Sequence, residues 1–402
     1  MREPSRVRVS GPLEPFASGF IAELEEAGYR PAAAAVQLRV LAHLSLWLAE
    51  EGLRPGELVE SEVDRFRQEH AARFVSVHGA GVAVLLRYLR GVGAVPVAAP
   101  VSMSAADELV ERYRRYLLIE RGLTAGTARG YVDLVRPFIE SRTDPAGGLV
   151  LWELTAADVL GFVLSQSDRR SRKSAKLLVS ALRSLLGYLH VQGVIARPLA
   201  GAVPSVAGWR LAGLPRALDP DQVRLLLGSC DRSSIAGVRD FAILTLLVRL
   251  GMRRGEVAGL RLDDIDWRAG ELVVRGKGAR VERLPLPADV GGALADYLSR
   301  GRPAGFVWRE VFVRVKAPLA PLTAGGVTQV VVSASNRAGI GEVTAHRLRH
   351  TAATELLRHG APLQEIAELL RHRTVLTTTI YAKVDRDRLR QLARPWPDGG
   401  AA

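Results

Sequence analysis

Two stretches in the first half of the chain repeat one another, and this repeat restricts that half to a pair of small helical bundles. Gly28 precedes Asp64 by 36 residues, and Gly122 precedes Asp158 by the same interval. Each stretch then closes on a similar phrase, LLRYLRGVG in the first and LLGYLHVQG in the second. We therefore predict a tandem pair of helical modules, with chance likeness between amphipathic helices as the alternative. Apolar residues three and four positions apart, which mark one face of a helix, occur at Val40, Leu41, Leu44, Trp47 and Leu48.

Proline-bearing segments divide the chain into three predicted domains. VGAVPVAAPVSMS and IARPLAGAVPSVAGWRLAGLPRAL separate the helical patterns from one another and from the last part of the chain. After the second segment, helical patterns at 219–227 and 238–250 lead into GELVVRGKGARVERLPLP, where two β-rich runs flank a Gly-Lys-Gly-Ala turn and predict a hairpin. From Thr344 onward the pattern is helical again. We predict all-α modules at residues 1–98 and 104–200, followed by a mixed α+β module at 214–396.

The charge of the chain favours a polyanion as its partner. Its 402 residues carry 55 Lys and Arg against 42 Asp and Glu, a formal net charge of +13, and only five of the basic residues are lysine. The planar guanidinium of arginine matches the oxygens of a phosphate, so double-stranded DNA is the simplest partner. The one cysteine, Cys230, excludes a disulfide framework and a thiolate metal site, which fits the cytoplasm. Because the chain has no run of about 18 uncharged apolar residues, we expect no membrane association.

Four short polar islands follow one another in the last module: GMRRGEVAGLRLDDIDW, RGKGARVERLPL, TAHRLRHTAATELL and LLRHRTVLTTTIYAKVD. Together they resemble the catalytic domain of the tyrosine recombinase (phage integrase) family. One such island would be weak evidence, whereas all four in order within one module are specific. The resemblance implies a SAM-like core-binding bundle, here duplicated, in front of a mixed α+β tyrosine recombinase catalytic domain. The positions that match the family's catalytic residues are Arg253, Lys277, His346, Arg349, His372 and Tyr381.

These residue types suit the breaking and rejoining of DNA strands. A tyrosine phenol, here that of Tyr381, can hold the phosphate in a 3′-phosphotyrosyl bond and later return it. Its ordinary pKa of about 10 leaves it protonated at neutral pH, so a histidine is needed to take the proton as it attacks. The guanidinium forks of Arg253 and Arg349 match the phosphoryl oxygens that gain negative charge in the transition state. Lys277, in the hairpin turn, can give a proton to the departing 5′ alkoxide.

Local patterns predict part of the geometry of this site. His346 and Arg349 are three residues apart, so on a helix they share one face. Gly251 follows the apolar run FAILTLLVRL and is expected just after a helix end, which places Arg253 directly beyond that helix. The island LRHR has an arginine, Arg371, where the family commonly has a glycine. If the backbone has a positive φ there, arginine costs roughly 1 kcal/mol more than glycine.

A basic helix start in the second module is a candidate for phosphate contacts outside the catalytic domain. The phrase SDRRSRKSAKLL places five basic side chains together, and a solvated helix face is the alternative. We expect the first module either to add DNA contacts or to assemble subunits. The sequence contains no metal-ligand spacing and no phosphate-binding glycine loop, so we expect neither a metal nor a cofactor. The candidate DNA-binding residues are Arg169, Arg170, Arg172, Lys173 and Lys176.

Two other functions stay open at the level of sequence. The segment TAATELLRHGAPLQEIAELLRH has the pattern of a helix-turn-helix DNA reader, which would make the chain a non-catalytic regulator. A type IB topoisomerase uses much the same chemistry to relax DNA. The complete series of six residues favours a recombinase over a reader. The family likeness implies a clamp around DNA, with two sites synapsed by a homotetramer or by assembly with related recombinases. We expect integration or transposition of a mobile element.

Overall fold

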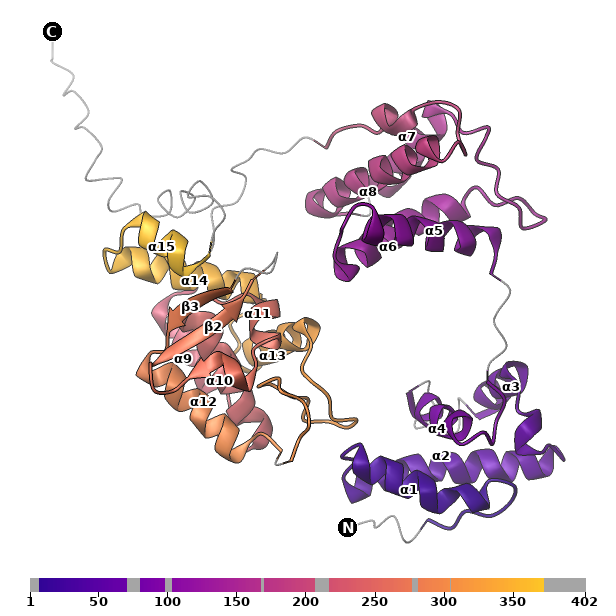
Figure 1. The fold of residues 1–402 in the computed structure, drawn as a ribbon, viewed down its shortest axis with the longest axis horizontal. Coiled ribbons are helices and arrows are strands. Elements are labelled where there is room, and N and C mark those ends of the chain that lie inside the picture. Colours follow the sequence, from indigo (N-terminus) through magenta and orange to yellow (C-terminus); the bar gives the residue numbers. More distant parts are fainter. Residues whose placement is uncertain are drawn as a thin grey trace. The chain divides into compact units, whose positions relative to one another are not determined.

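The computed structural model describes residues 7–70, 80–97, 103–167, 170–206, 217–276, 281–303 and 305–371. It is mostly helical, with one small sheet near the middle of the last module (Figure 1). By their contacts, residues 97–212 form one compact unit, and the remaining residues form the other. Within these units the buried side chains gather into separate clusters for each predicted module, and a small fourth cluster joins the last two helices that the structure describes. The exact domain boundaries stay a prediction.

The first module is helical, as its periodicity predicts, and its described residues form four α-helices. All five apolar residues predicted to share one face are buried, and they lie on its longest helix, α2. By length and composition alone α2 is apolar enough to cross a membrane, but half of that stretch is buried within the protein, as in the core helix of a folded domain. The helices are α1 (Ala17–Glu26), α2 (Pro31–Glu50), α3 (Glu60–His70) and α4 (Ala80–Gly91), with short 3-10 turns at Glu14–Phe16 and Pro55–Glu57.

In the second module, too, the described residues form four successive α-helices. Gly28 and Gly122, which occupy matching places in the sequence repeat, have φ values of 79° and 57°, a region that favours glycine. The tyrosines of the two closing phrases, Tyr88 and Tyr188, are both buried. These shared features agree with a duplication, which stays a prediction. The helices are α5 (Ala105–Ile119), α6 (Ala125–Glu140), α7 (Ala156–Ser167) and α8 (Arg172–Val191), followed by a 3-10 turn at Leu199–Ala202.

The third module, called the catalytic module from here on, combines helices with a three-stranded antiparallel sheet. The predicted hairpin is confirmed, since β2 (Glu271–Arg275) pairs with β3 (Val281–Pro285), and the short β1 (Ile265–Asp266) pairs with the other edge of β2. The two helices predicted before the hairpin are also confirmed. The helices are α9 (Pro220–Gly228), α10 (Ile235–Arg249), α11 (Arg254–Ala258), α12 (Ala288–Arg300), α13 (Ala324–Arg337), α14 (Ala345–Arg358) and α15 (Leu363–Leu369), with a 3-10 turn at Leu262–Asp264.

Helix α10 is the central element of the catalytic module. Every residue from Gly237 to Val248 is buried except Phe241, which is half-buried, so the helix is covered on all sides. Helices α12, α13 and α14 pack against it. Gly251 follows its end with a φ of +57°, which confirms the expected left-handed glycine after the helix. A central helix covered in this way holds the chain that continues beyond Gly251 at a defined place.

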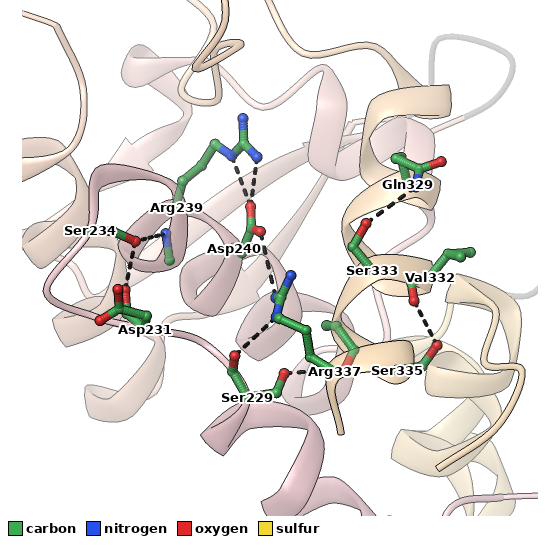
Figure 2. A network of polar contacts seen from close by, with 12 residues as sticks. Ser229, Asp231, Ser234, Arg239, Asp240, Gln329, Val332, Ser333, Ser335 and Arg337 are labelled. Atoms are coloured by element: carbon green, nitrogen blue, oxygen red, sulfur yellow. Dashed lines mark hydrogen bonds and ion pairs between the residues drawn. The ribbon is translucent and has the colours of Figure 1, made fainter. Parts of the chain in front are cut away.

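A polar network built around one buried ion pair holds the other end of α10 (Figure 2). The guanidinium of Arg239 donates to Asp240 at 2.7 Å, and both side chains are about nine-tenths buried. Arg337, at the end of α13, donates from Nε to the carbonyl of Ser229, and the Ser234 hydroxyl accepts from the Gly237 amide to cap the helix. Arg337 also lies 3.9 Å from Asp240, so the network joins α10 to the loop before it and to α13. It lies at the opposite end of the helix from Gly251, roughly 15 to 20 Å away by helical rise.

Replacing Gly251 with alanine is expected to destabilise the catalytic module for two reasons. Alanine is less stable than glycine at a positive φ, and its Cβ would also clash with neighbouring side chains. Its added Cβ would lie 2.7 Å from a methyl carbon of Leu370 and 3.4 Å from the Cβ of Ala352. Gly339→Ala is the matched control, because Gly339 also has a positive φ, +66°, but nothing lies within 4 Å of an added Cβ. We expect Gly339→Ala to cost about 1 kcal/mol and Gly251→Ala clearly more. Scanning calorimetry of both variants checks this, and equal shifts would contradict it.

Candidate active site

Arg253 stands at the start of α11, two residues beyond Gly251, in an extended backbone conformation. Its amide and its Nη1 atom both donate to the carboxylate of Glu256, at 2.8 Å and 2.5 Å. Its Nη2 atom donates to the backbone carbonyl of Arg371 at 3.0 Å. The side chain nevertheless stays 42% exposed, while that of Glu256 is only 4% exposed. Glu256 and the Arg371 carbonyl therefore fix the position of the Arg253 guanidinium, and its exposed part is accessible to a ligand.

Arg349 is a buried arginine on α14 that binds two backbone carbonyls. Its Nη1 atom donates to the carbonyl of Gly251 at 2.6 Å, and its Nη2 atom donates to the carbonyl of Leu370. The first contact reaches the turn after α10, and the second reaches the end of α15. Arg349 thus ties together three parts of the catalytic module that are far apart in sequence.

The turn formed by Leu370 and Arg371 brings the two predicted phosphate-binding arginines together. The carbonyl of Leu370 accepts from Arg349, and the carbonyl of the next residue, Arg371, accepts from Arg253. Arg371 has a φ of +54°, so the backbone here is left-handed. The condition under which an arginine in the LRHR island is less stable than glycine is therefore met. Both guanidinium groups therefore contact the same turn, one through each of two successive carbonyls.

A buried ion pair connects this turn with α11. The Nη2 atom of Arg371 donates to Glu256 at 2.7 Å, and the two side chains are 3% and 4% exposed. Burial by itself raises the pKa of Glu256, but the positive charge of Arg371 and the hydrogen bonds from Arg253 outweigh it and hold the pKa below its ordinary value. Glu256 is consequently a carboxylate at neutral pH, with a cation on each side.

His346 lies one turn before Arg349 at the start of α14, which confirms the predicted placement of both on one helix. Its side chain is exposed, and its ring meets that of His350 edge-on, with centroids 4.3 Å apart. Burial, together with the neighbouring His346 and Arg349, lowers the pKa of His350 to about 4. His350 is therefore neutral at pH 7 and contributes no charge to the site.

The remaining predicted catalytic residues lie outside the described ranges. Lys277 belongs to the connection between β2 and β3, and His372 and Tyr381 follow the last described residue. Several other arginines of the catalytic module have local partners. Arg275 pairs with the buried Asp264 at 2.8 Å, Arg283 pairs with Glu271 at 2.8 Å, and Arg254 donates to the Thr328 hydroxyl.

The basic helix start of the second module has the exposure that a phosphate contact needs. Ser171 caps α8 by accepting from the amide of Ser174, and Arg172 and Lys176 are exposed. Arg170 makes one long contact with Gln166, at 3.4 Å. Arg169 and the side chain of Lys173 lie outside the described residues, and a DNA-binding role for this helix start stays a prediction.

The site contains two residues that sequence reasoning did not assign to it. Glu256 was visible only as the glutamate that follows Arg253, and Arg371 only as a departure from glycine. The sequence signal for Arg371 is a charged residue at a position where a left-handed backbone favours glycine. Within the described ranges of the chain, no three His, Cys, Asp or Glu side chains gather in a way that could hold a metal ion.

Comparison with known proteins agrees with this geometry. Residues 216–388 match the model of the phage integrase family, and residues 110–193 match the SAM-like N-terminal domain of phage integrases. The chain is 41% identical to a Sinorhizobium fredii protein named as an integrase/recombinase, y4rA, over 96% of this chain and 95% of the relative. It is 32% identical to the tyrosine recombinase XerD of Listeria monocytogenes, over 71% of this chain and 97% of that relative. The fold resembles the XerH site-specific recombinase bound to its difH substrate, with a TM-score of 0.56, 21% identity, and coverage of 72% and 85% of the two chains.

Glu256→Gln is expected to lower the stability of the folded protein and to flatten its response to acid. At neutral pH, removing the buried carboxylate leaves Arg371 without its ionic partner, at a cost of about 3 to 5 kcal/mol. Because the pKa of Glu256 is lower in the folded protein than its ordinary 4.5, its contribution is complete above that value and is lost as the pH falls through the folded pKa. Thermal unfolding of the wild type and the variant between pH 3 and pH 7 checks both expectations.

Glu271→Gln is the control for this measurement, since Glu271 forms an exposed ion pair with Arg283. Such a pair contributes about 0 to 1 kcal/mol. If both glutamine variants had the same small effect at pH 7, the buried pair would not stabilise the catalytic module.

Proposed function

The chain belongs to the phage integrase family of tyrosine recombinases, and we propose that Tyr381 is the nucleophile with which it cleaves DNA. Like its family, the protein is an enzyme that binds DNA, cleaves its strands and rejoins them in site-specific recombination. In the proposed reaction the phenol oxygen of Tyr381 attacks the scissile phosphorus, a 3′-phosphotyrosyl bond forms, and the bond to the 5′ oxygen breaks.

The observation that carries this proposal is the convergence of Arg253 and Arg349 on one turn. Their guanidinium groups bind the carbonyls of adjacent residues, and the segment with His372 and Tyr381 starts directly after that turn. Arg253 is exposed and can bind one non-bridging oxygen of a phosphate directly. Arg349 is buried with both Nη atoms on carbonyls, so in the proposed reaction it exchanges one of these contacts for the second oxygen when DNA binds. The two arginines would stabilise the negative charge that grows on these oxygens as Tyr381 attacks.

Proton transfer completes the proposed assignment. His346 is exposed and lies on the same helix face as Arg349, so it is placed to exchange a proton near a phosphate bound by that arginine. His346 and His372 are the two candidates to take the phenol proton of Tyr381. We assign Lys277 to give a proton to the departing 5′ oxygen, because it belongs to the turn of the β2–β3 hairpin. This chemistry needs neither a metal ion nor a cofactor.

We also propose that the protein integrates or transposes a mobile element in the cytoplasm. The support is its likeness over nearly its whole length to a protein named as an integrase/recombinase. Four protomers, either identical or including related recombinases, would hold two double-stranded DNA sites together. The second module would contact the DNA backbone through the start of α8, using Arg169, Arg170, Arg172, Lys173 and Lys176.

The distribution of charge favours subunit assembly as the role of the first module. Residues 1–96 contain 11 Lys and Arg and 12 Asp and Glu, a net charge of −1, although the whole chain carries +13. The repeat aligns residues 169–176, which contain five basic side chains, with residues 69–76, which contain one. A module without this excess of positive charge gains little from binding the phosphate backbone. We therefore propose that it contacts a second copy of the chain.

Covalent capture tests the nucleophile directly. The purified protein is incubated with fragmented DNA of its own genome, denatured, and the attached DNA is sequenced. We expect adducts at a few specific sites, and we expect Tyr381→Phe to form none, because phenylalanine has no oxygen to bond the phosphorus. Tyr131→Phe, which changes a half-buried tyrosine of the second module, is the control and should form adducts like the wild type.

Two results would contradict the assignment. Specific binding without any adduct would support a non-catalytic DNA reader. Adducts scattered without sequence preference would support an enzyme that relaxes DNA rather than a site-specific recombinase.

A truncated chain that lacks residues 1–98 tests the proposed role of the first module. We expect it to bind a captured DNA site with the affinity and salt dependence of the full chain, because the deletion removes no net positive charge. We expect it to fail to join two such sites into one complex, as measured by sedimentation. A clear decrease in the slope of log affinity against log salt would show instead that the module contacts phosphates.

A further inference from the structure

Arg371 occupies a position that is costly for an arginine. Its φ of +54° lies in the left-handed region, where a residue with a Cβ is less stable than glycine. Its side chain is 3% exposed, so a charged group is buried. Its Nε atom is also buried and has no hydrogen-bond partner within the part of the chain that the structure describes. Glycine would close the same turn without any of these costs.

The contacts of Arg371 lead from the turn to Arg253 by two routes. Its Nη2 atom donates to Oε2 of Glu256 at 2.7 Å, while Oε1 of the same carboxylate accepts from Arg253 at 2.5 Å. Its backbone carbonyl accepts directly from Nη2 of Arg253 at 3.0 Å. The Nη1 atom of Arg371 donates to the carbonyl of Leu369 and fixes the side chain against the end of α15. Arg371 therefore holds both the carboxylate and the carbonyl that orient Arg253.

The charges of these three residues leave one positive charge available. A carboxylate that faces one arginine forms a neutral pair with it, and the pair attracts a phosphate weakly. In this cluster the second oxygen of Glu256 is occupied by Arg371, so two guanidinium groups share one carboxylate. Of the two arginines, only Arg253 is substantially exposed, at 42%. The remaining positive charge is thus presented to solvent by Arg253.

We propose that Arg371 is a positioning residue for DNA cleavage, which holds Glu256 so that Arg253 meets the scissile phosphate with its positive charge uncompensated. The inference rests on the proposed role of Arg253 as a phosphate ligand. Arg371 itself does not touch the DNA in this arrangement, since its guanidinium is buried behind Glu256. Its effect on the reaction passes through Glu256 and Arg253.

Three variants separate this role from a purely structural one. Arg371→Gly removes the charge but suits the left-handed backbone, and Arg371→Lys keeps the charge without the planar fork. Arg239→Met is the matched control, because Arg239 is also a buried arginine paired with a carboxylate in the same module, at the opposite end of α10 (Figure 2). Each variant is measured for thermal unfolding, for affinity to a captured DNA site, and for the single-turnover rate of adduct formation with DNA saturated by protein.

We expect Arg371→Gly to form the adduct about 10- to 100-fold more slowly than the wild type once it is bound, because a small displacement of a positioned group has a large effect on rate. Its affinity for DNA should change much less than this rate. Arg371→Lys should be faster than Arg371→Gly. Arg239→Met should unfold at a lower temperature and still cleave at the wild-type rate at a temperature where it is folded.

Several results would overturn the proposal. Wild-type cleavage by a folded Arg371→Gly, or an equal loss of cleavage rate in Arg239→Met and Arg371→Gly, would reduce Arg371 to a structural role. If Arg371→Gly does not fold, Arg371→Lys decides: wild-type cleavage by this variant excludes a need for the arginine fork. If the wild type itself forms no adduct at Tyr381, both this proposal and the assigned nucleophile are wrong. If the wild type forms adducts and the Arg371 variants form them at the same rate, only the proposal about Arg371 is wrong.

Discussion

The buried ion pair between Arg371 and Glu256 is the interaction on which the candidate site depends. It joins the turn after α15 to the start of α11, two segments more than one hundred residues apart in the sequence. Both groups are almost completely buried, so the pair is shielded from salt and water and each partner needs the other. The carboxylate that binds Arg371 also binds Arg253, and the turn that carries Arg371 also accepts from Arg349. One ion pair therefore fixes the relation between both arginines.

The rest of the catalytic module supplies rigid supports for this pair. Helix α10 is covered on all sides and ends at Arg249, two residues before Gly251. The carbonyl of Gly251 accepts from Arg349, and its left-handed backbone turns the chain toward Arg253. The polar network around the buried Arg239 holds the other end of the same helix (Figure 2). Because α14 packs against α10, Arg349 and His346 are positioned by the same core. Precise placement of charged groups on rigid elements is what stabilisation of a phosphoryl transition state requires.

The sequence predicts the elements of this arrangement better than their long-range contacts. The helix end at Gly251, the hairpin, and the shared helix of His346 and Arg349 are all indicated by local patterns with a short period. The sequence raises the possibility of a positive φ at Arg371, because an arginine replaces the family's common glycine in the LRHR island, but it does not predict that φ. Its pairing with Glu256 could not, since two charges distant in sequence give no local signal of contact. The acceptors at Leu370 and Arg371 are backbone carbonyls, which every residue has, so no residue type marks them.

The claim that Arg253 and Arg349 act on the charge of one phosphate can be tested by removing that charge. A captured DNA site is synthesised with a neutral methylphosphonate at the scissile position, and adduct formation is compared with that on the ordinary phosphate for the wild type, Arg253→Ala and Arg349→Ala. If the arginines neutralise the phosphate oxygens, each alanine variant should lose much less rate on the neutral substrate than the roughly 100- to 1,000-fold expected on the charged one. Equal losses on both substrates would contradict this role and make the arginines supports of the fold alone.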